Sequence, residues 1–188
     1  FNILQPTGRG EGMHKVEEDL SIEELVELGE WIERDLSNRT NLNLQYSHPH
    51  AFKPLSKMFG ENVDGCSRCG IFTILGVLGD GSYAMCGIAE TMQELVFGSV
   101  NTDTLENIWS NNSILNEIRE GLPQKLEGIC SECIMKNICL GFCLAQNYIA
   151  HKNFWSPYWY CYNASEKRVF PNTRKIKIVN DMELLKKL

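Results

Sequence analysis

The sequence predicts an α+β fold, in which a strand, a helix and a second strand precede a small cysteine-rich region with a β-hairpin, short helices and two metal-cluster sites. Three observations lead to this prediction. Apolar residues recur at helical spacing over residues 22–36, glycines interrupt an apolar stretch at residues 79–81, and four cysteines fall within residues 130–143. With 188 residues and 43% hydrophobic content, the chain can bury a core without disulfides.

The opening segment has the rhythm of an α/β unit. Residues 1–4 are predicted to end a buried strand, because proline and glycines in the stretch 6–10 force an irregular turn. Residues 21–24 form a capping box that predicts a helix over 22–36. A short alternating strand is expected over residues 41–46. The buried face of the helix is expected to carry Ile22, Leu25, Val26, Ile32 and Leu36.

The rest of the chain is predicted to contain one hairpin and several short helices. Residues 72–78 and 82–86 are expected to pair around a turn at 79–81. Helices are expected over 104–109 and 113–120, with Thr104 and Ser113 as N-caps and Gly121 and Pro123 as the stop. A further helical stretch follows residue 143, and a short helix is expected near residues 182–188. The predicted core residues of the two short helices are Leu105, Ile108, Trp109, Leu115 and Ile118.

Four of the eight cysteines form one run, in which Cys130, Cys133, Cys139 and Cys143 have the spacing C-x2-C-x5-C-x3-C. A Cys-x2-Cys turn presents two sulfurs to one centre, and a second pair completes the shell of four thiolates that iron–sulfur clusters and structural zinc both use. The remaining cysteines are Cys66, Cys69, Cys86 and Cys161. Eight thiols therefore make two complete four-ligand sites.

The division of these thiols follows from their positions. Three precede the run and five lie in it or after it, so two sites of four require one of these five to cross over. Cys143 is assigned this role, because in two-cluster ferredoxins the last cysteine of a closely spaced run binds the other cluster. Site I is then Cys66, Cys69, Cys86 and Cys143. Site II is Cys130, Cys133, Cys139 and Cys161.

Other features exclude several classes of protein. His48 and His50 are potential ligands, but the thiols already fill two sites and we expect these loop histidines to be exposed.

A net charge of −6 without a basic stripe argues against nucleic acid, and no stretch is apolar enough to cross a membrane. Without a signal segment, a reducing, cytoplasmic setting is expected. The aromatic residues at 154–160 are assigned to packing around site II, with peptide docking as the alternative.

The cysteine pattern resembles the SPASM extension of radical S-adenosylmethionine enzymes, which reads C-x9-15-G-x4-C, then C-x2-C-x5-C-x3-C, then a last cysteine. Here Cys69 and Gly81 enclose eleven residues, residues 81–86 supply G-x4-C, and Cys161 ends the pattern. The resemblance covers roughly residues 61–165. It implies two auxiliary [4Fe-4S] clusters with the crossed ligation given above. It also implies three parts: the end of a partial radical S-adenosylmethionine barrel (1–60), a SPASM domain (61–165), and a tail returning to the barrel (166–188).

One departure from the family limits what this chain is expected to do. The C-x3-C-x2-C triplet that holds the catalytic cluster is absent, so we expect the chain to be the C-terminal part, or one piece, of a larger enzyme. S-adenosylmethionine and a third [4Fe-4S] cluster would belong to the missing part. Arg9 lies in a turn that resembles the substrate-facing end of the barrel, where it would meet an anionic group; an exposed, unpaired arginine is the alternative.

The resemblance implies a maturase that modifies a ribosomally made peptide or a protein side chain. Its partners would be the peptide or protein substrate, the remainder of the barrel, and an external electron donor or acceptor. Because every ligand position is cysteine, no iron is left open, and electron transfer is favoured over direct binding of substrate to a cluster. Two alternatives stay open: a structural zinc-binding module, and a stand-alone iron–sulfur electron carrier.

Overall fold

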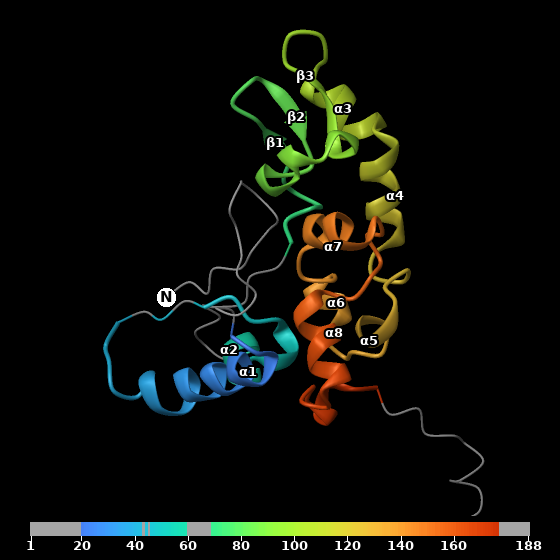
Figure 1. Cartoon of the computed structure of the whole chain (residues 1–188). Helices are drawn as coiled ribbons and strands as arrows, with labels where there is room; N and C mark the ends of the chain where they lie inside the picture. Colours follow the sequence, from blue (N-terminus) through green and yellow to red (C-terminus); the bar gives the residue numbers. More distant parts are fainter. Residues whose placement is uncertain (1–19, 43, 45, 60–68, 177–188) are drawn as a thin grey trace, which may run out of the picture.

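The computed structural model describes residues 20–42, 44, 46–59 and 69–176 (Figure 1). A three-stranded sheet lies at one end of an elongated body, and the helices that follow it lead down to α8 at the other end (Figure 1). None of the described helices has the length and apolar character needed to cross a membrane. The principal helices are α1 (Ile22–Trp31), α2 (Leu55–Phe59), α3 (Leu105–Asn111), α4 (Ser113–Gly121), α5 (Gly128–Ser131), α6 (Lys136–Cys139), α7 (Leu144–His151) and α8 (Trp159–Glu166).

The predicted first helix is confirmed, and α1 continues as a π-helical turn, η2 (Ile32–Leu36). The capping box is present: the Ser21 backbone N–H donates to the Glu24 carboxylate at 2.7 Å, and the Glu24 N–H donates to the Ser21 hydroxyl at 3.2 Å. Ile22, Leu25 and Ile32 are buried, as their spacing predicts. Through this face α1 packs against α8.

The strand expected over residues 41–46 is not formed at the described positions 41, 42, 44 and 46. A side chain takes the place of a neighbouring strand there, because the Lys53 ammonium donates to the backbone oxygen of Tyr46 at 2.9 Å. The Tyr46 hydroxyl in turn contacts the Glu33 carboxylate. The other predicted strand, at 1–4, lies outside the described residues, as does the helix expected at 182–188. The described residues therefore do not show a partial barrel.

The predicted hairpin is confirmed with shorter strands, β1 (Gly76–Val77) and β2 (Ser82–Ala84), which pair antiparallel. Gly81 adopts a φ of 82°, the left-handed conformation that the turn requires, and the Leu78 N–H donates to the Ser82 oxygen at 2.8 Å. A third strand, β3 (Val96–Ser99), extends the sheet in the order β1-β2-β3. The sequence pattern did not predict β3, because a four-residue strand containing glycine lacks clear alternation.

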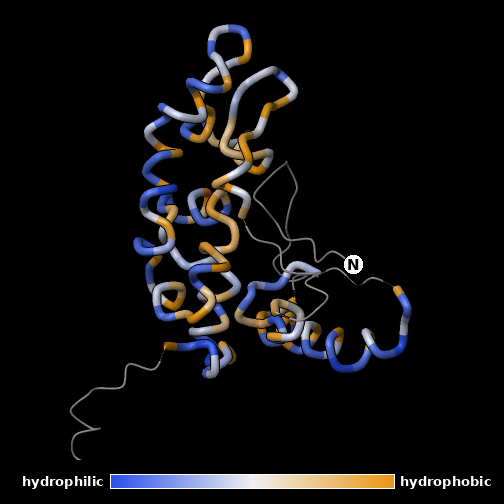
Figure 2. Tube along the Cα trace, turned by 180° about the vertical axis from the view of Figure 1, so that it is seen from behind, coloured by the Kyte–Doolittle hydropathy of each residue, from blue (hydrophilic) through white to orange (hydrophobic). Residues whose placement is uncertain are grey.

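The two short helices after the sheet are confirmed, with one correction to their caps. Thr104 caps α3, but Asn112 rather than Ser113 caps α4, since its side-chain oxygen accepts the Leu115 N–H at 3.0 Å. The core prediction is right for Ile108, Leu115 and Ile118 and wrong for Leu105, which is 54% exposed; Trp109 is half-buried beneath the Arg119 guanidinium. Hydrophilic residues dominate the outer side of α4 (Figure 2).

The end of α4 packs closely against the aromatic residues 154–160, which precede Cys161 in the chain. A methyl group built on Gly121 would lie well inside contact distance of the Trp155 ring, 2.8 Å from its Cζ3 atom. A backbone hydrogen bond also joins the chain after α4 to this segment: the Glu127 N–H donates to the Trp155 oxygen at 2.9 Å. Gly121 therefore permits the approach of α4 to the chain around residue 155.

Replacing Gly121 with alanine is expected to lower the free energy of unfolding by about 1–3 kcal/mol, because a rigid indole ring must move to admit the methyl group. Urea unfolding of the two proteins measures this difference. Gly79→Ala is the matched control, since no atom lies within 4 Å of the corresponding added methyl group. Equal losses in both variants would show that the Trp155 contact does not constrain this position.

Candidate metal centre

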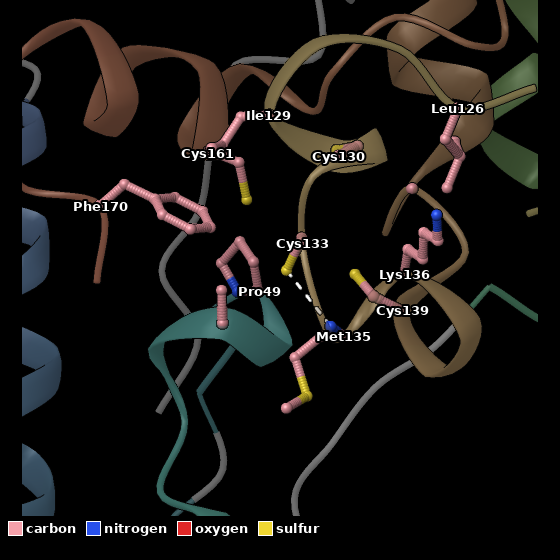
Figure 3. A pocket seen from close by; sticks show the side chains of 12 residues that line it. Pro49, Leu126, Ile129, Cys130, Cys133, Met135, Lys136, Cys139, Cys161 and Phe170 are labelled. Carbon is pink, nitrogen blue, oxygen red and sulfur yellow. Dashed lines mark hydrogen bonds between the residues drawn. The ribbon is translucent and has the colours of Figure 1, made fainter. Parts of the chain in front are cut away.

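Three segments bring the thiols of site II together. Helix α5 carries Cys130, and Cys133 follows in the next turn. Helix α6 ends at Cys139, and α8 carries Cys161. These four cysteines line one pocket. Their sulfur atoms point toward a common space (Figure 3).

A sharp turn separates Cys139 from Cys143. Leu140, Gly141 and Phe142 all have positive φ, at 53°, 78° and 63°, so the chain reverses over three consecutive left-handed residues. The Asn147 amide, which is buried, holds this turn by donating to the Gly141 oxygen at 3.2 Å. The reversal gives a physical reason why Cys139 contributes to one group of thiols and Cys143 to another.

Backbone N–H groups surround the sulfurs of site II. The Met135 N–H donates to Cys133 Sγ with a nitrogen–sulfur distance of 3.4 Å. Cys130 is approached by the N–H of Tyr158, and Cys139 by the N–H groups of His50 and Phe142. Such donors stabilise thiolates, and hydrogen bonds to sulfur are among the main controls on cluster potential.

His48 and His50 are buried, at 2% and 1% exposure, so the expectation that both are exposed is wrong. The 3-10 helix η3 (His50–Phe52) carries His50 beside site II, and the neighbouring residues Pro49 and Ala51 line the cysteine pocket. His48 Nε2 lies 2.8 Å from the Leu25 oxygen, and its ring packs on Tyr160. These contacts attach the N-terminal segment to the cysteine-rich region.

Burial gives the thiols of site II a strong preference for the neutral form. It raises the pKa of Cys130 to about 11 and that of Cys139 to about 12, and it raises the pKa of Cys161 well above its ordinary value. Repulsion between the thiolates acts in the same direction. Four thiolates can share this pocket only if bound cations compensate their charge.

The described part of site I forms a second group. Electrostatic interactions link Cys143 with Cys69 and Cys86, although the three are far apart in the sequence. The N–H of Leu144, which directly follows Cys143, approaches the sulfur of Cys69. Burial raises the pKa of Cys143 to about 11 and raises that of Cys69. Cys66, the fourth predicted ligand, lies outside the described residues, and so does Arg9.

A zinc site and an iron–sulfur cluster require different distances between the sulfur atoms of their ligands. All seven described cysteines are free thiols. Among the described residues, no group of three or more His, Cys, Asp or Glu side chains is arranged to hold a single metal ion. Tetrahedral zinc would require sulfurs about 3.8 Å apart, since each lies ~2.3 Å from the ion. A cluster binds each thiolate through a separate iron, so its thiolates lie farther apart than those that share one zinc ion.

One charged residue lies near site II although the sequence did not predict it there. Arg174 is held against the Cys130–Cys133 loop by backbone pairing: the Ile134 N–H donates to the Arg174 oxygen at 2.9 Å, and the Ile176 N–H donates to the Glu132 oxygen at 2.7 Å. Burial raises the pKa of Cys133, and the positive charge of Arg174 opposes that shift. In the sequence, Arg174 is simply one basic residue of a basic tail.

Comparison with protein families identifies one region of the chain. Residues 66–134 match the model of SPASM, an iron-sulfur cluster-binding domain. Searches of curated proteins and of solved structures gave no match. The matched range contains Cys66, Cys69, Cys86, Cys130 and Cys133 and ends before the other three cysteines. Those three are placed beside it by the structure alone.

Proposed function

We propose that this chain, whose residues 66–134 form a SPASM region, is the auxiliary-cluster part of a radical S-adenosylmethionine enzyme that modifies a ribosomally made peptide or a protein side chain. The observation that carries the proposal is the lining of one buried pocket by four cysteines from three segments. The second group, around Cys143, supports a second cluster beside the first. Each site is proposed to hold one [4Fe-4S] cluster.

The residues around site II suit a centre that exchanges electrons. A bound [4Fe-4S] cluster supplies a one-electron couple. Cys161 and Phe170 are buried on one side of the pocket, and Leu126 and Met135 are buried on other sides, so the lining excludes most water. Four cysteines leave no coordination position for substrate. We therefore favour electron transfer as the role of this site.

The aromatic segment contributes to that environment by packing. The ring centroids of Phe142 and Tyr158 lie 4.6 Å apart, and those of Tyr148 and Phe154 lie 4.5 Å apart. Tyr158 and Phe154 are buried, which leaves them no surface for docking a peptide. These contacts support the packing assignment of residues 154–160.

The remaining parts of the proposal concern what lies beyond the described residues. S-adenosylmethionine, the catalytic cluster and the peptide substrate are proposed to bind the rest of the enzyme, with Arg9 near that boundary. An external donor or acceptor would exchange electrons with the auxiliary clusters. The SPASM match supports this setting, because cluster-binding domains of this family accompany radical S-adenosylmethionine enzymes.

Metal and sulfide content tests the cofactor assignment. The chain, purified and reconstituted without oxygen, is expected to contain about eight irons and about eight acid-labile sulfides. A protein that instead binds about two zinc ions and no sulfide would contradict the proposal and support the zinc-module alternative. Determining zinc and iron on the same sample separates the two results.

A further inference from the structure

A second pocket lies next to the cysteine pocket and has no role in the function proposed above. Its cavity volume is about 330 Å³, at the lower end of the range of small-ligand sites. Its walls come from α1 and η2, from residues 51–54, and from the segment 169–174. Ala51 lines both pockets, so they share a wall.

Arg174 is the one charged group of this second pocket that has an unsatisfied, buried donor among the described residues. Its Nε has no hydrogen-bond partner, and its Nη2 makes only a long contact of 3.4 Å with the Lys53 oxygen. No carboxylate in the described part of the chain forms an ion pair with it. A buried guanidinium donor without an acceptor is costly, which favours an anionic ligand at this position.

The other residues of the pocket narrow the class of anion. Lys53 already donates to the Tyr46 oxygen, so the guanidinium of Arg174 is the group that can donate to a bound anion. Glu30 and Glu33 line the same pocket and would repel a phosphate dianion more strongly than a singly charged carboxylate. A single carboxylate suits the planar fork, and the apolar surface of Phe52 and Val169 suits a peptide-like body.

Arg174 also connects this pocket with site II. Backbone pairing fixes it beside the Cys133 loop, and its charge acts on the Cys133 sulfur. A nearby positive charge stabilises the electron that a cluster gains on reduction. A carboxylate paired with the guanidinium would cancel much of that charge, so the reduced cluster would become less stable.

We propose that this second pocket binds the carboxylate of a peptide ligand through Arg174, and that binding makes the reduction potential of the site II cluster more negative. The coupling rests on the proposed function, because it requires a cluster in site II. The binding of the carboxylate to Arg174 does not require a cluster. The redox change concerns the one-electron couple of the cluster, with the electron supplied by the titrating reductant.

Calorimetric titration of the cluster-loaded chain tests the binding step, with N-acetylglycine as the probe and its uncharged analogue N-acetylglycinamide as the control ligand. At low ionic strength, N-acetylglycine is expected to bind at least about ten times more tightly than the amide. Arg174→Gln should remove this preference, whereas Arg174→Lys should retain part of it. Arg168→Gln, which removes the same charge from an exposed position outside the pocket, should leave the preference unchanged.

Reductive titration followed by electron paramagnetic resonance tests the coupling. N-acetylglycine should shift the site II potential to a more negative value in the unaltered protein and in Arg168→Gln. Arg174→Gln should start from a more negative value and show no shift. Equal preference for the carboxylate in Arg174→Gln overturns the binding site. Binding without a shift overturns the coupling alone, and failure to load iron–sulfur clusters overturns the proposed function instead.

Discussion

Replacing Cys143 with alanine is expected to remove about four of the roughly eight irons, while the cluster of site II remains. The reason is the turn at residues 140–142, which directs Cys143 toward Cys69 and Cys86 and away from Cys139. A site I with three thiolates keeps an exposed iron and is expected to lose its cluster on purification. Iron and sulfide analysis of the reconstituted variant measures the loss.

A matched pair of variants distinguishes this ligand partition from its alternatives. Cys139→Ala makes the same substitution four residues earlier and is expected to remove the site II cluster instead. Each single variant should lose a different paramagnetic resonance signal, and the double variant should contain almost no iron. If both cysteines belonged to one site, the double variant would retain about four irons, like each single variant.

Local signals in the sequence predicted those parts of the fold that depend on nearby residues. The capping box of Ser21 and Glu24 and the glycine turn at 79–81 each depend on contacts within a few positions, and both are present. The cap of α4 was misplaced by one residue because Asn112 and Ser113 are both good capping residues. The cap is the residue that precedes the first helical one, and local composition does not show that the helix begins at Ser113.

Long-range packing decided the features that the sequence did not reveal. A strand at 41–46 requires a partner strand, and alternation alone does not supply one. His48 is buried because residues of α1 and α8 contact its ring, and His50 is buried beside Cys139, whereas proline next to a histidine favours an exposed loop. Arg174 reaches the Cys133 loop through pairing between segments about forty residues apart. The cysteine spacing indicated a metal centre, but it could not show the charge beside it.

The turn between Cys139 and Cys143 illustrates the same limit. Glycine at position 141 suggests a left-handed residue, but leucine and phenylalanine on either side of it do not. A non-glycine residue in this conformation costs roughly 1–2 kcal/mol, so surrounding interactions must hold the turn in place. Part of that support comes from Asn147, and the proposed clusters on both sides of the turn would supply more.

Removing the clusters is therefore expected to loosen the turn and the two short helices α5 and α6, which carry Cys130 and Cys139. α5 and α6 contain four residues each, far fewer than an isolated helix needs for stability in water. After chelation under reducing conditions, the backbone amides of Cys139 and Leu140 should exchange with solvent at least about tenfold faster. Both donate within the α6 segment, to the oxygens of Met135 and Lys136. Hydrogen exchange measured by mass spectrometry follows this change.

The end of α4 provides the internal control for that experiment. Its Leu122 amide donates to the Ile118 oxygen at 3.0 Å, and the helix completely buries Leu115 and Ile118, in a core cluster that also contains Cys130 and Leu140. Because α4 has nine residues and carries no proposed ligand, exchange there should change less than in α6. Unchanged protection of Cys139 and Leu140 after complete loss of iron would show that the polypeptide alone holds the turn. Faster exchange at every position would instead indicate that the clusters stabilise the whole fold.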